Sequence, residues 1–455
     1  MGGEKPVLRP EIEAMPRDRL ESLQLERLQW QVARLYRHSP FYRQRLKAAA
    51  VSPRAIRTLA DIRRLPFTTK EDLLEMQRKS PPFGDHLLPP RRRWVEIHPS
   101  SGEVPLYTVW SKADVSRITD MAARALYSTG ARPGDLIHNA LAYGLWVGGL
   151  AAHYGAVSAG MVVVPIGTDS LRRQIEYLVN FKPRVLLTTP SQGLYLAEQI
   201  RQRGLGLADV GLEIGAFAAE PGVENPSTRQ RLERALGLLA YDLYGLAEVT
   251  PLMAAECEAK AGLHWPEDHY LVELIHPGTL EPVAPGEIGI LVFTDLTREA
   301  LPLLRYWTND YATYTDEPCA CGRTLLRSPG GVLGRSDQLL IFQGAKFYPA
   351  ELERLLHEYP ELGEEYRLSL ERDQTTLVDR CTLVVESAPQ ALWEGPALTA
   401  RLQRHLREEL RLMAEVRLVR YGTLERTMRQ SRRVQDLRLV GRPAVQAVPG
   451  EVREW

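Results

Sequence analysis

The regular alternation of helix and strand patterns between residues 115 and 215 most limits the folds open to this chain. The runs "MVVVPIG" and "PRVLLTT" are short and rich in β-branched residues, whereas "SLRRQIEYLVNF" and "SQGLYLAEQIRQRG" have the apolar spacing of helices. Strands that alternate with helices along a chain pair into a sheet connected by crossover helices. We therefore predict an α/β fold built on such a sheet.

Helices are also predicted near the N-terminus. Residues 18–50 carry an apolar stripe at helical spacing, and Pro40 is expected to interrupt the helix. The next helix lies in "TTKEDLLEM", where Thr68 or Thr69 can cap the first turn and the following acidic residues favour its positive end.

A change of pattern towards the C-terminus indicates a second domain. Residues 270–345 read as strands and turns, and beyond them helices and strands alternate in a short segment ("PAELERLLHEY", "EYRLSLERD", "RCTLVVESA", "ALTARLQRHLREEL", "AEVRLVRYG"). We predict a large N-terminal domain, residues 1–335, made of α/β subdomains with a β-rich portion. A small mobile α+β domain, residues 336–455, follows it.

The charge of the chain excludes some partners. Its 455 residues carry 57 basic and 57 acidic side chains, so no net charge draws it to nucleic acid or to an anionic membrane. The apolar stretch of residues 139–167 is long enough to cross a membrane, but its glycines favour a buried helix that runs into a strand. The first twenty residues are polar and do not resemble a signal peptide. A cytoplasmic protein is expected.

Three of the four cysteines and one histidine have the spacing of a metal site. Cys257 precedes His264 by seven residues, and Cys319 and Cys321 are two apart in "EPCACGR". Such a Cys₃His set suits tetrahedral Zn²⁺ and would form a closed, structural site. The alternative is three unconnected thiols and a surface histidine. The fourth cysteine, Cys381, is expected in the core.

Several segments in order resemble the phenylacetate-coenzyme A ligase family of adenylate-forming enzymes, from about residue 20 to residue 440. They are "YRHSPFYRQRL", "LPFTTKEDL", "YGLWVGGLAAHYGA", "YDLYGLAE", "TREALPLLRYWTND" and "GRSDQLLIFQGAKFYPAELE". The resemblance implies that a small carboxylic acid reacts with ATP, with Mg²⁺ bound, and that the acyl group then passes to coenzyme A. It also implies a structural zinc at the Cys₃His set. A homodimer or a partner protein is compatible with it.

The same resemblance assigns roles to individual residues. Glu248 stands at the Mg²⁺ position, Asp337 at the hinge of the small domain and Gly344 beside the coenzyme A channel. Residues of the nucleotide pocket are Glu220, Pro221, Asp242, Tyr244, Gly245, Thr308, Asp310 and Arg335, while Tyr143, Trp146 and His153 stand on the wall of the acyl pocket or in a buried helix. Trp307 and Asn309 depart from the family's Arg-Tyr-Arg-Thr-Gly-Asp pattern at "RYWTND".

Two further departures concern the chemistry with ATP. The family's phosphate loop reads Ser-Ser-Gly-Thr-Thr-Gly-Lys-Pro, but here Ser100, Ser101 and Gly102 are followed directly by Glu-Val-Pro. The family's catalytic lysine is replaced by Gln430, and no lysine follows Lys346. A lost cation costs transition-state stabilisation, and a carboxylate in the loop repels phosphate.

Two functions follow as hypotheses. The first is a ligase-like enzyme whose adenylation step is impaired or altered. In one variant, Arg429 or Arg432 supplies the positive charge in a divergent way. In another, the enzyme uses a preformed acyl adenylate or thioester. The second is a non-catalytic homologue that binds a nucleotide, an acyl group or a partner protein.

Overall fold

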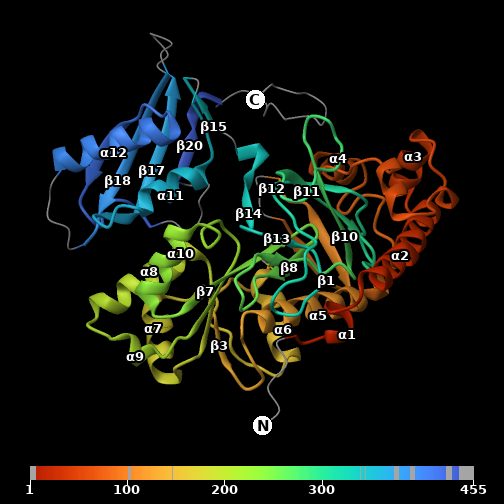
Figure 1. The fold of residues 1–455 in the computed structure, drawn as a ribbon, viewed down its shortest axis with the longest axis horizontal. Coiled ribbons are helices and arrows are strands. Elements are labelled where there is room, and N and C mark those ends of the chain that lie inside the picture. Colours follow the sequence, from red (N-terminus) through yellow and green to blue (C-terminus); the bar gives the residue numbers. More distant parts are fainter. Residues whose placement is uncertain are drawn as a thin grey trace. The chain divides into compact units, whose positions relative to one another are not determined.

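The computed structural model describes residues 7–100, 104–145, 147–338, 340–343, 345–372, 379–389, 395–426 and 433–439 (Figure 1). The chain separates into two compact units, each treated by itself below. The first comprises residues 1–188, 206–219 and 238–332, and the second comprises residues 189–205, 220–237 and 333–455.

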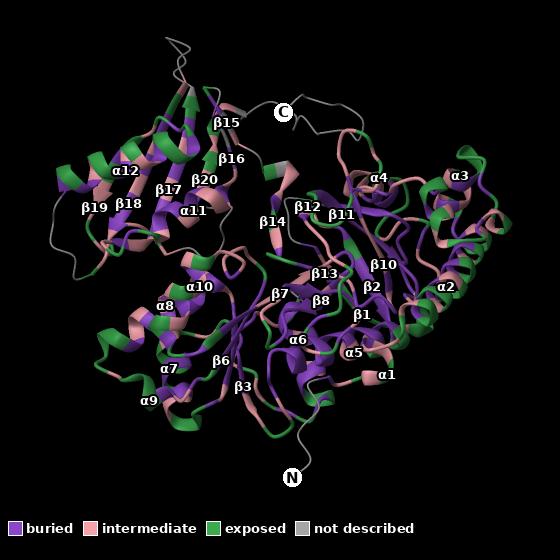
Figure 2. Ribbon diagram, in the orientation of Figure 1, coloured by how far each residue is buried: buried purple, intermediate pink, exposed green. Residues whose placement is uncertain are grey.

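The first unit contains an eight-stranded sheet in the order β13-β9-β8-β7-β6-β5-β3-β4. Its strands are β3 (Leu136–Asn139), β4 (Val162–Val164), β5 (Val185–Thr188), β6 (Ile214–Phe217), β7 (Leu239–Leu246), β8 (Thr250–Ala255), β9 (Leu263–His264) and β13 (Arg327–Ser328). The pairs from β4 to β7 are parallel, and β7 pairs with β8 in antiparallel fashion. Every residue of β5 and β6 is buried, as expected of parallel strands covered on both faces (Figure 2).

Helices pack closely against this sheet. They are α5 (Lys112–Ser128), α6 (Gly148–Ser158), α7 (Leu171–Phe181) and α9 (Leu207–Val210). A side chain at Gly155 would come within 2.6 Å of the backbone of Ala122, so α6 can approach α5 this closely only with glycine there. Trp110, Ile118, Leu126, Ile137 and Val185 are among the residues of the core they enclose.

A second sheet has the order β10-β11-β12-β14; β10, β11 and β12 belong to the first unit, whereas β14 begins at Val332, the last residue of that unit, and continues into the second. In the first unit β1 also pairs with β2 in a separate hairpin. The strands are β1 (Trp94–Pro99), β2 (Tyr107–Ser111), β10 (Tyr270–Ile275), β11 (Gly289–Asp295), β12 (Tyr306–Ala312) and β14 (Val332–Arg335). The N-terminal helices are α1 (Pro10–Glu13), α2 (Arg17–His38), α3 (Pro40–Ala48) and α4 (Lys70–Lys79). The predicted break falls at Ser39, whose hydroxyl caps α3 by accepting a hydrogen bond from Tyr42.

Thr69 caps the start of α4, and it is one of the two residues predicted as the cap. Its hydroxyl accepts a hydrogen bond from the Asp72 amide, and the Asp72 carboxylate accepts one from the Thr69 amide. Thr68 instead is buried and bonds to the backbone of Leu304 and Arg305. This anchoring sets the position of Lys70, the first residue of the helix.

The second unit holds a four-stranded sheet in the order β19-β18-β17-β20, covered by helices. Its elements are α8 (Pro190–Gln202), α10 (Pro226–Leu236), β15 (Leu340–Phe342), β16 (Ala345–Phe347), α11 (Pro349–His357), β17 (Leu362–Arg372), β18 (Asp379–Ser387), α12 (Gly395–Leu410), β19 (Glu415–Val419) and β20 (Val434–Asp436). Leu352, Leu368, Leu383 and Leu402 lie in its core, and Cys381 is buried there as predicted.

The α/β fold class is confirmed, including the order of helices and strands in the C-terminal segment. The second unit also takes in residues 189–205 and 220–237, so the division into domains 1–335 and 336–455 stays a prediction. Across the described ranges, every helix is either too short or too polar to cross a bilayer.

Candidate functional site

The hairpin of β1 and β2 closes the loop that stands at the phosphate position. The strands pair as far as Pro99 and Tyr107, and Ser100 and Leu106 then exchange hydrogen bonds. The Ser100 amide donates to the Leu106 carbonyl at 2.8 Å, and the Leu106 amide donates to the Ser100 hydroxyl at 3.0 Å. Only residues 101–105 therefore remain between the closed ends of the hairpin. Ser101 and Gly102 lie outside the described residues.

Tyr244 on β7 and Asp310 on β12 meet although 66 residues separate them. The Tyr244 hydroxyl donates to Asp310 Oδ2 at 2.5 Å, and the Tyr244 ring packs edge-on against Trp265 at 5.4 Å. The Asp310 amide donates to the Thr308 hydroxyl at 2.9 Å, and that hydroxyl donates to the Leu291 carbonyl at 2.8 Å. The structure thus brings Tyr244, Thr308 and Asp310 together, as the resemblance implies.

The two departures beside Asp310 contact each other. Trp307 Nε1 donates to Asn309 Oδ1 at 3.0 Å, and the Trp307 ring packs edge-on against Phe67 at 5.1 Å. Asn309 has a φ of 69°, in the left-handed region that asparagine tolerates better than most residues other than glycine. Asparagine in place of the family's glycine therefore preserves the backbone turn that presents Asp310.

Glu248, at the Mg²⁺ position, already has a cationic neighbour. Lys70 Nζ lies 2.9 Å from Glu248 Oε1, and the Glu248 side chain is only 9% exposed. The capped first turn of α4 holds Lys70 in place, and Arg298 donates to the Glu248 carbonyl. No local pattern indicates this pair, because 178 positions separate the two residues.

Gly245 and Asp242 serve the packing of β7 against its neighbours. A side chain at Gly245 would lie 2.2 Å from the Pro251 carbonyl oxygen, so β8 can approach β7 this closely only because residue 245 is glycine. The Asp242 amide donates to Glu256 Oε2 at 2.9 Å, and the Glu256 amide donates to the Asp242 carbonyl at 2.9 Å.

Two residues predicted for the acyl pocket, Tyr143 and His153, lie side by side. The Tyr143 hydroxyl and His153 Nδ1 are 3.2 Å apart, and Asn139 Nδ2 donates to the same hydroxyl at 2.8 Å. Burial raises the pKa of Tyr143 to about 12, so the phenol stays neutral and can donate to the imidazole. The third predicted residue, Trp146, lies outside the described residues.

The other predicted nucleotide residues belong to the second unit. Glu220 Oε1 accepts a hydrogen bond from the Ser191 amide at 2.6 Å, so the carboxylate sits at the first turn of α8. Burial raises the pKa of Glu220. Pro221 follows it, and Arg335 ends β14. Asp337 lies in a 3₁₀ turn over Ser336–Gln338, and its role as the hinge stays a prediction.

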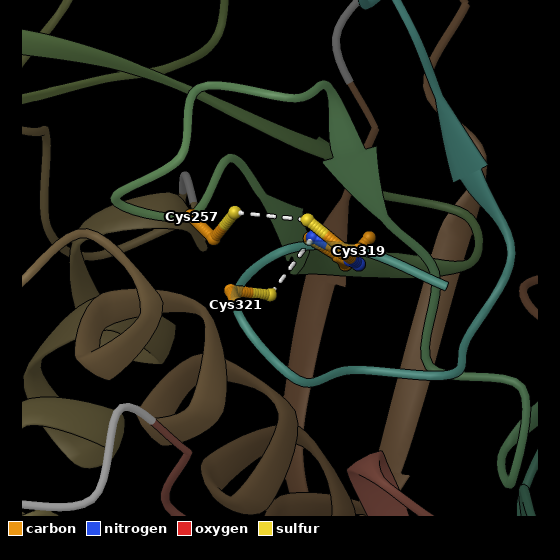
Figure 3. A group of neighbouring side chains, drawn as sticks. Cys257, Cys319 and Cys321 are labelled. Carbon is orange, nitrogen blue, oxygen red and sulfur yellow. Dashed lines mark hydrogen bonds between the residues drawn. The ribbon is translucent and has the colours of Figure 1, made fainter. Parts of the chain in front are cut away.

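The four predicted zinc ligands converge in the first unit, as Figure 3 shows for the three cysteines. Their ligand atoms all lie within 4.8 Å of one another. Cys257 Sγ is 3.7 Å from Cys319 Sγ, and Cys321 Sγ is 3.7 Å from His264 Nε2. A hydrogen bond from the Cys257 thiol lowers the pKa of Cys321, and one from His264 lowers the pKa of Cys319.

These distances fit a tetrahedral zinc. Zn–S bonds of about 2.3 Å at a tetrahedral angle place two sulfurs roughly 3.8 Å apart, close to the observed separation. Residues 319–322 form a tight turn, called the knuckle below, in which the Gly322 amide donates to the Cys319 carbonyl at 2.9 Å. Nε2 is the His264 nitrogen that lies beside Cys321 Sγ, so Nε2 is the nitrogen placed to act as the ligand. Nδ1 is buried and has no hydrogen-bond partner among the described residues.

Gly344 and Gln430, two residues singled out for the coenzyme A step and for catalysis, lie outside the described residues, as do Arg429 and Arg432. Described arginines near Gln430 in the sequence are bound to carboxylates. Arg426 Nη1 lies 2.7 Å from Glu386 Oε2, Arg433 Nη1 lies 2.9 Å from Glu353 Oε1, and Arg438 Nη2 lies 2.6 Å from Asp436 Oδ2.

Comparison with known proteins supports the ligase resemblance along the whole chain. The phenylacetate-coenzyme A ligase of Thermus thermophilus is 39% identical, covering 95% of this chain and 100% of that protein. The Escherichia coli phenylacetate-coenzyme A ligase is 36% identical, with 94% and 97% covered. Residues 344–438 match the AMP-binding enzyme C-terminal domain.

A solved structure agrees. The crystal structure of 2-hydroxyisobutyryl-CoA ligase in complex with 2-HIB-AMP aligns with a TM-score of 0.89 at 30% identity, covering 97% of this chain and 94% of that one. The fold and the C-terminal domain therefore define the class of adenylate-forming ligases. Within that class, the chain belongs to the phenylacetate-coenzyme A ligase family.

Proposed function

We propose that this protein binds the adenylate of a small carboxylic acid and passes its acyl group to coenzyme A, while it forms that adenylate from ATP only slowly. The observation that carries the proposal is the closed hairpin at Ser100 and Leu106, which leaves residues 101–105 where the family has a longer, lysine-containing loop. The aryl or acyl class of the acid follows from the relatives and is part of the proposal.

The shortened loop is poorly suited to a triphosphate. Loops that cradle phosphate do so with successive backbone N–H groups and a cation, and this loop has two residues fewer than the family's and no lysine. Glu103 adds a negative charge within the loop. Two like charges 4 Å apart at an effective dielectric constant of 20 repel by about 4 kcal/mol. Binding of the β- and γ-phosphates should therefore be weakened.

The missing lysine affects the same step. It would offset charge that develops between the acyl carboxylate and the α-phosphate, and losing one such contact typically costs about 3–4 kcal/mol, or roughly 10²–10³-fold in rate. Arg426, Arg433 and Arg438 already neutralise carboxylates, so they are poor substitutes for a mobile point charge. The proposed slow step is adenylation.

The nucleoside side of the pocket supports retention of adenylate binding. Asp310 is buried, and the Tyr244 hydroxyl donates a hydrogen bond to its carboxylate. Lys70 next to Glu248 supplies a positive charge where Mg²⁺ would otherwise be held. The second candidate is a non-catalytic scaffold that binds an adenylate or an acyl group. It needs the same pocket, and it becomes the better proposal if the protein does not transfer the acyl group to coenzyme A.

The test compares the two half-reactions. Phenylacetate-dependent ATP–pyrophosphate exchange should be at least about 100-fold slower than for the Escherichia coli relative assayed in parallel. Synthetic phenylacetyl adenylate should bind by calorimetry and yield a thioester when coenzyme A is added. Exchange equal to that of the relative would refute slow adenylation. Binding of the adenylate without thioester formation would favour the scaffold.

We predict that Asp310→Asn weakens AMP binding by roughly 10–100-fold. A hydrogen bond to a charged group contributes about 1.5–3 kcal/mol, and the amide removes the charge while keeping the shape. Calorimetry with AMP and with 2′,3′-dideoxy-AMP measures the effect. The two nucleotides should bind the variant about equally, and Asp316→Asn, at an exposed aspartate of the same unit, should leave both affinities unchanged. If Asp310→Asn preferred AMP over 2′,3′-dideoxy-AMP by the same factor as the wild type does, Asp310 would not bind the ribose.

We further propose that Cys257, His264, Cys319 and Cys321 hold one structural Zn²⁺. Support comes from the distances between their ligand atoms and from the choice of three soft thiols and one imidazole. With all four positions taken by the protein, such a zinc would stabilise the fold of the surrounding turns and would take no part in the reaction.

A further inference from the structure

The knuckle that carries Cys319 and Cys321 is bound to the N-terminal segment of the chain. The amide of Thr324 donates to the carbonyl of Glu13 at 3.0 Å, and the Thr324 hydroxyl donates to the carbonyl of Met15 at 2.6 Å. These two bonds join residues more than 300 positions apart. They place α1 directly beside the candidate metal site.

Arg323 connects the two through its side chain. It is only 1% exposed, its Nε donates to Glu13 Oε1 at 2.7 Å, and its Nη1 lies 3.5 Å from Cys321 Sγ. A buried guanidinium needs negative partners, because burying an uncompensated charge is costly. Here it has one carboxylate from the N-terminal segment and one sulfur from the metal set. Glu13, Arg323 and His264 also line the same small cavity.

The contacts continue along the N-terminal segment. The Arg9 amide donates to the second Glu13 oxygen at 3.1 Å, and Arg17 Nη1 lies 2.8 Å from the Glu267 carboxylate. That carboxylate also accepts a hydrogen bond from the Leu326 amide at 2.6 Å. Arg323 is thus held by the buried carboxylate of Glu13, which belongs to the N-terminal segment, and Leu326 is held by the buried carboxylate of Glu267, which also binds Arg17 of that segment.

We propose that metal binding and docking of residues 9–17 are coupled through Glu13 and Arg323, which act as positioning residues for Cys321. With metal bound, the three thiolates leave the site with net negative charge, and Arg323 between Cys321 and Glu13 balances it. Partners of this kind beside metal ligands typically affect metal affinity by 10–100-fold. Coupling is reciprocal, so loss of the metal weakens docking by the same factor. This inference rests on the zinc proposal.

The first test is zinc affinity, measured by competition with a chromophoric chelator on the full-length chain. Glu13→Gln should bind zinc about 10–100-fold more weakly than the wild type. Glu11→Gln is the matched control, because Glu11 lies on the same helix but is exposed. The zinc affinity of this variant should equal that of the wild type. Wild-type affinity in Glu13→Gln would overturn the inference.

The second test needs no substitution and so does not depend on the folding of a variant. Hydrogen exchange of the wild-type chain is compared with zinc and after chelation. Peptides covering residues 9–24 should exchange at least about tenfold faster without zinc, whereas peptides covering α3 should be unchanged. Unchanged exchange over residues 9–24 on zinc removal would refute the coupling. Absence of zinc from the purified protein by mass spectrometry would instead refute the zinc proposal itself, and the coupling with it.

Discussion

Gln430→Lys alone is expected to leave acid-dependent ATP–pyrophosphate exchange at its low level. Only a chain that also has Glu103-Val104 replaced by Thr-Thr-Gly-Lys, which restores the length and the lysine of the loop, should gain activity. The reason is that the two defects act on the same step, so the lysine cannot act on a triphosphate that the loop does not hold. The combined change should raise exchange by roughly 10²–10³-fold, the typical weight of one such contact in a desolvated site.

Gln435→Lys is the matched control for this experiment. It introduces the same cation at an exposed position on β20 of the same unit, and it should change nothing. Full recovery with Gln430→Lys alone would show that the loop matters less than proposed. No gain from the combined change, in a protein that still binds AMP, would show that adenylation is limited elsewhere.

Cys321→Ser is expected to abolish stoichiometric zinc binding and to lower the thermal unfolding temperature. A serine hydroxyl is a poor zinc ligand, and structural zinc contributes several kcal/mol or more to the fold that surrounds it. Metal content by mass spectrometry and calorimetric unfolding measure both effects. Zinc affinity of the wild type should also fall as the pH falls, because protons compete with the metal for the thiolates.

Cys381→Ala separates metal loss from ordinary loss of packing. Cys381 is buried in the second unit, away from the cluster in sequence and outside the set of converging ligands. The variant should lose some stability but keep one zinc per chain. If Cys321→Ser kept a full equivalent of zinc, the assignment of the four ligands would be wrong.

Much of the secondary structure could be predicted from local patterns. The break between α2 and α3 comes from Pro40 and Ser39, and the start of α4 comes from Thr69 and Asp72. The strands β4 and β5 lie within the two predicted runs, "MVVVPIG" and "PRVLLTT". These features depend on residues that are neighbours in the chain, so the chain alone carries the information.

Part of the site could also be predicted. The short loop after Ser100, the absence of lysine beyond Lys346 and the Cys-x-Cys knuckle are all properties of contiguous sequence. The resemblance to one family assigned Tyr244 and Asp310 to one pocket, and the structure brings them together. The hairpin bonds between Ser100 and Leu106 show where this short loop is closed.

Contacts between distant segments could not be predicted in this way. Nothing in the local sequence pairs Lys70 with Glu248 or Glu13 with Arg323. Such pairs form because sheets and helices pack in one arrangement that buries apolar surface, and polar groups carried into that arrangement must find partners there. The sequence therefore determines the elements and the two departures from the family's motifs, at the loop after Gly102 and at Gln430. Their packing decides which charges meet, since burial makes each unpaired charge too costly to leave alone.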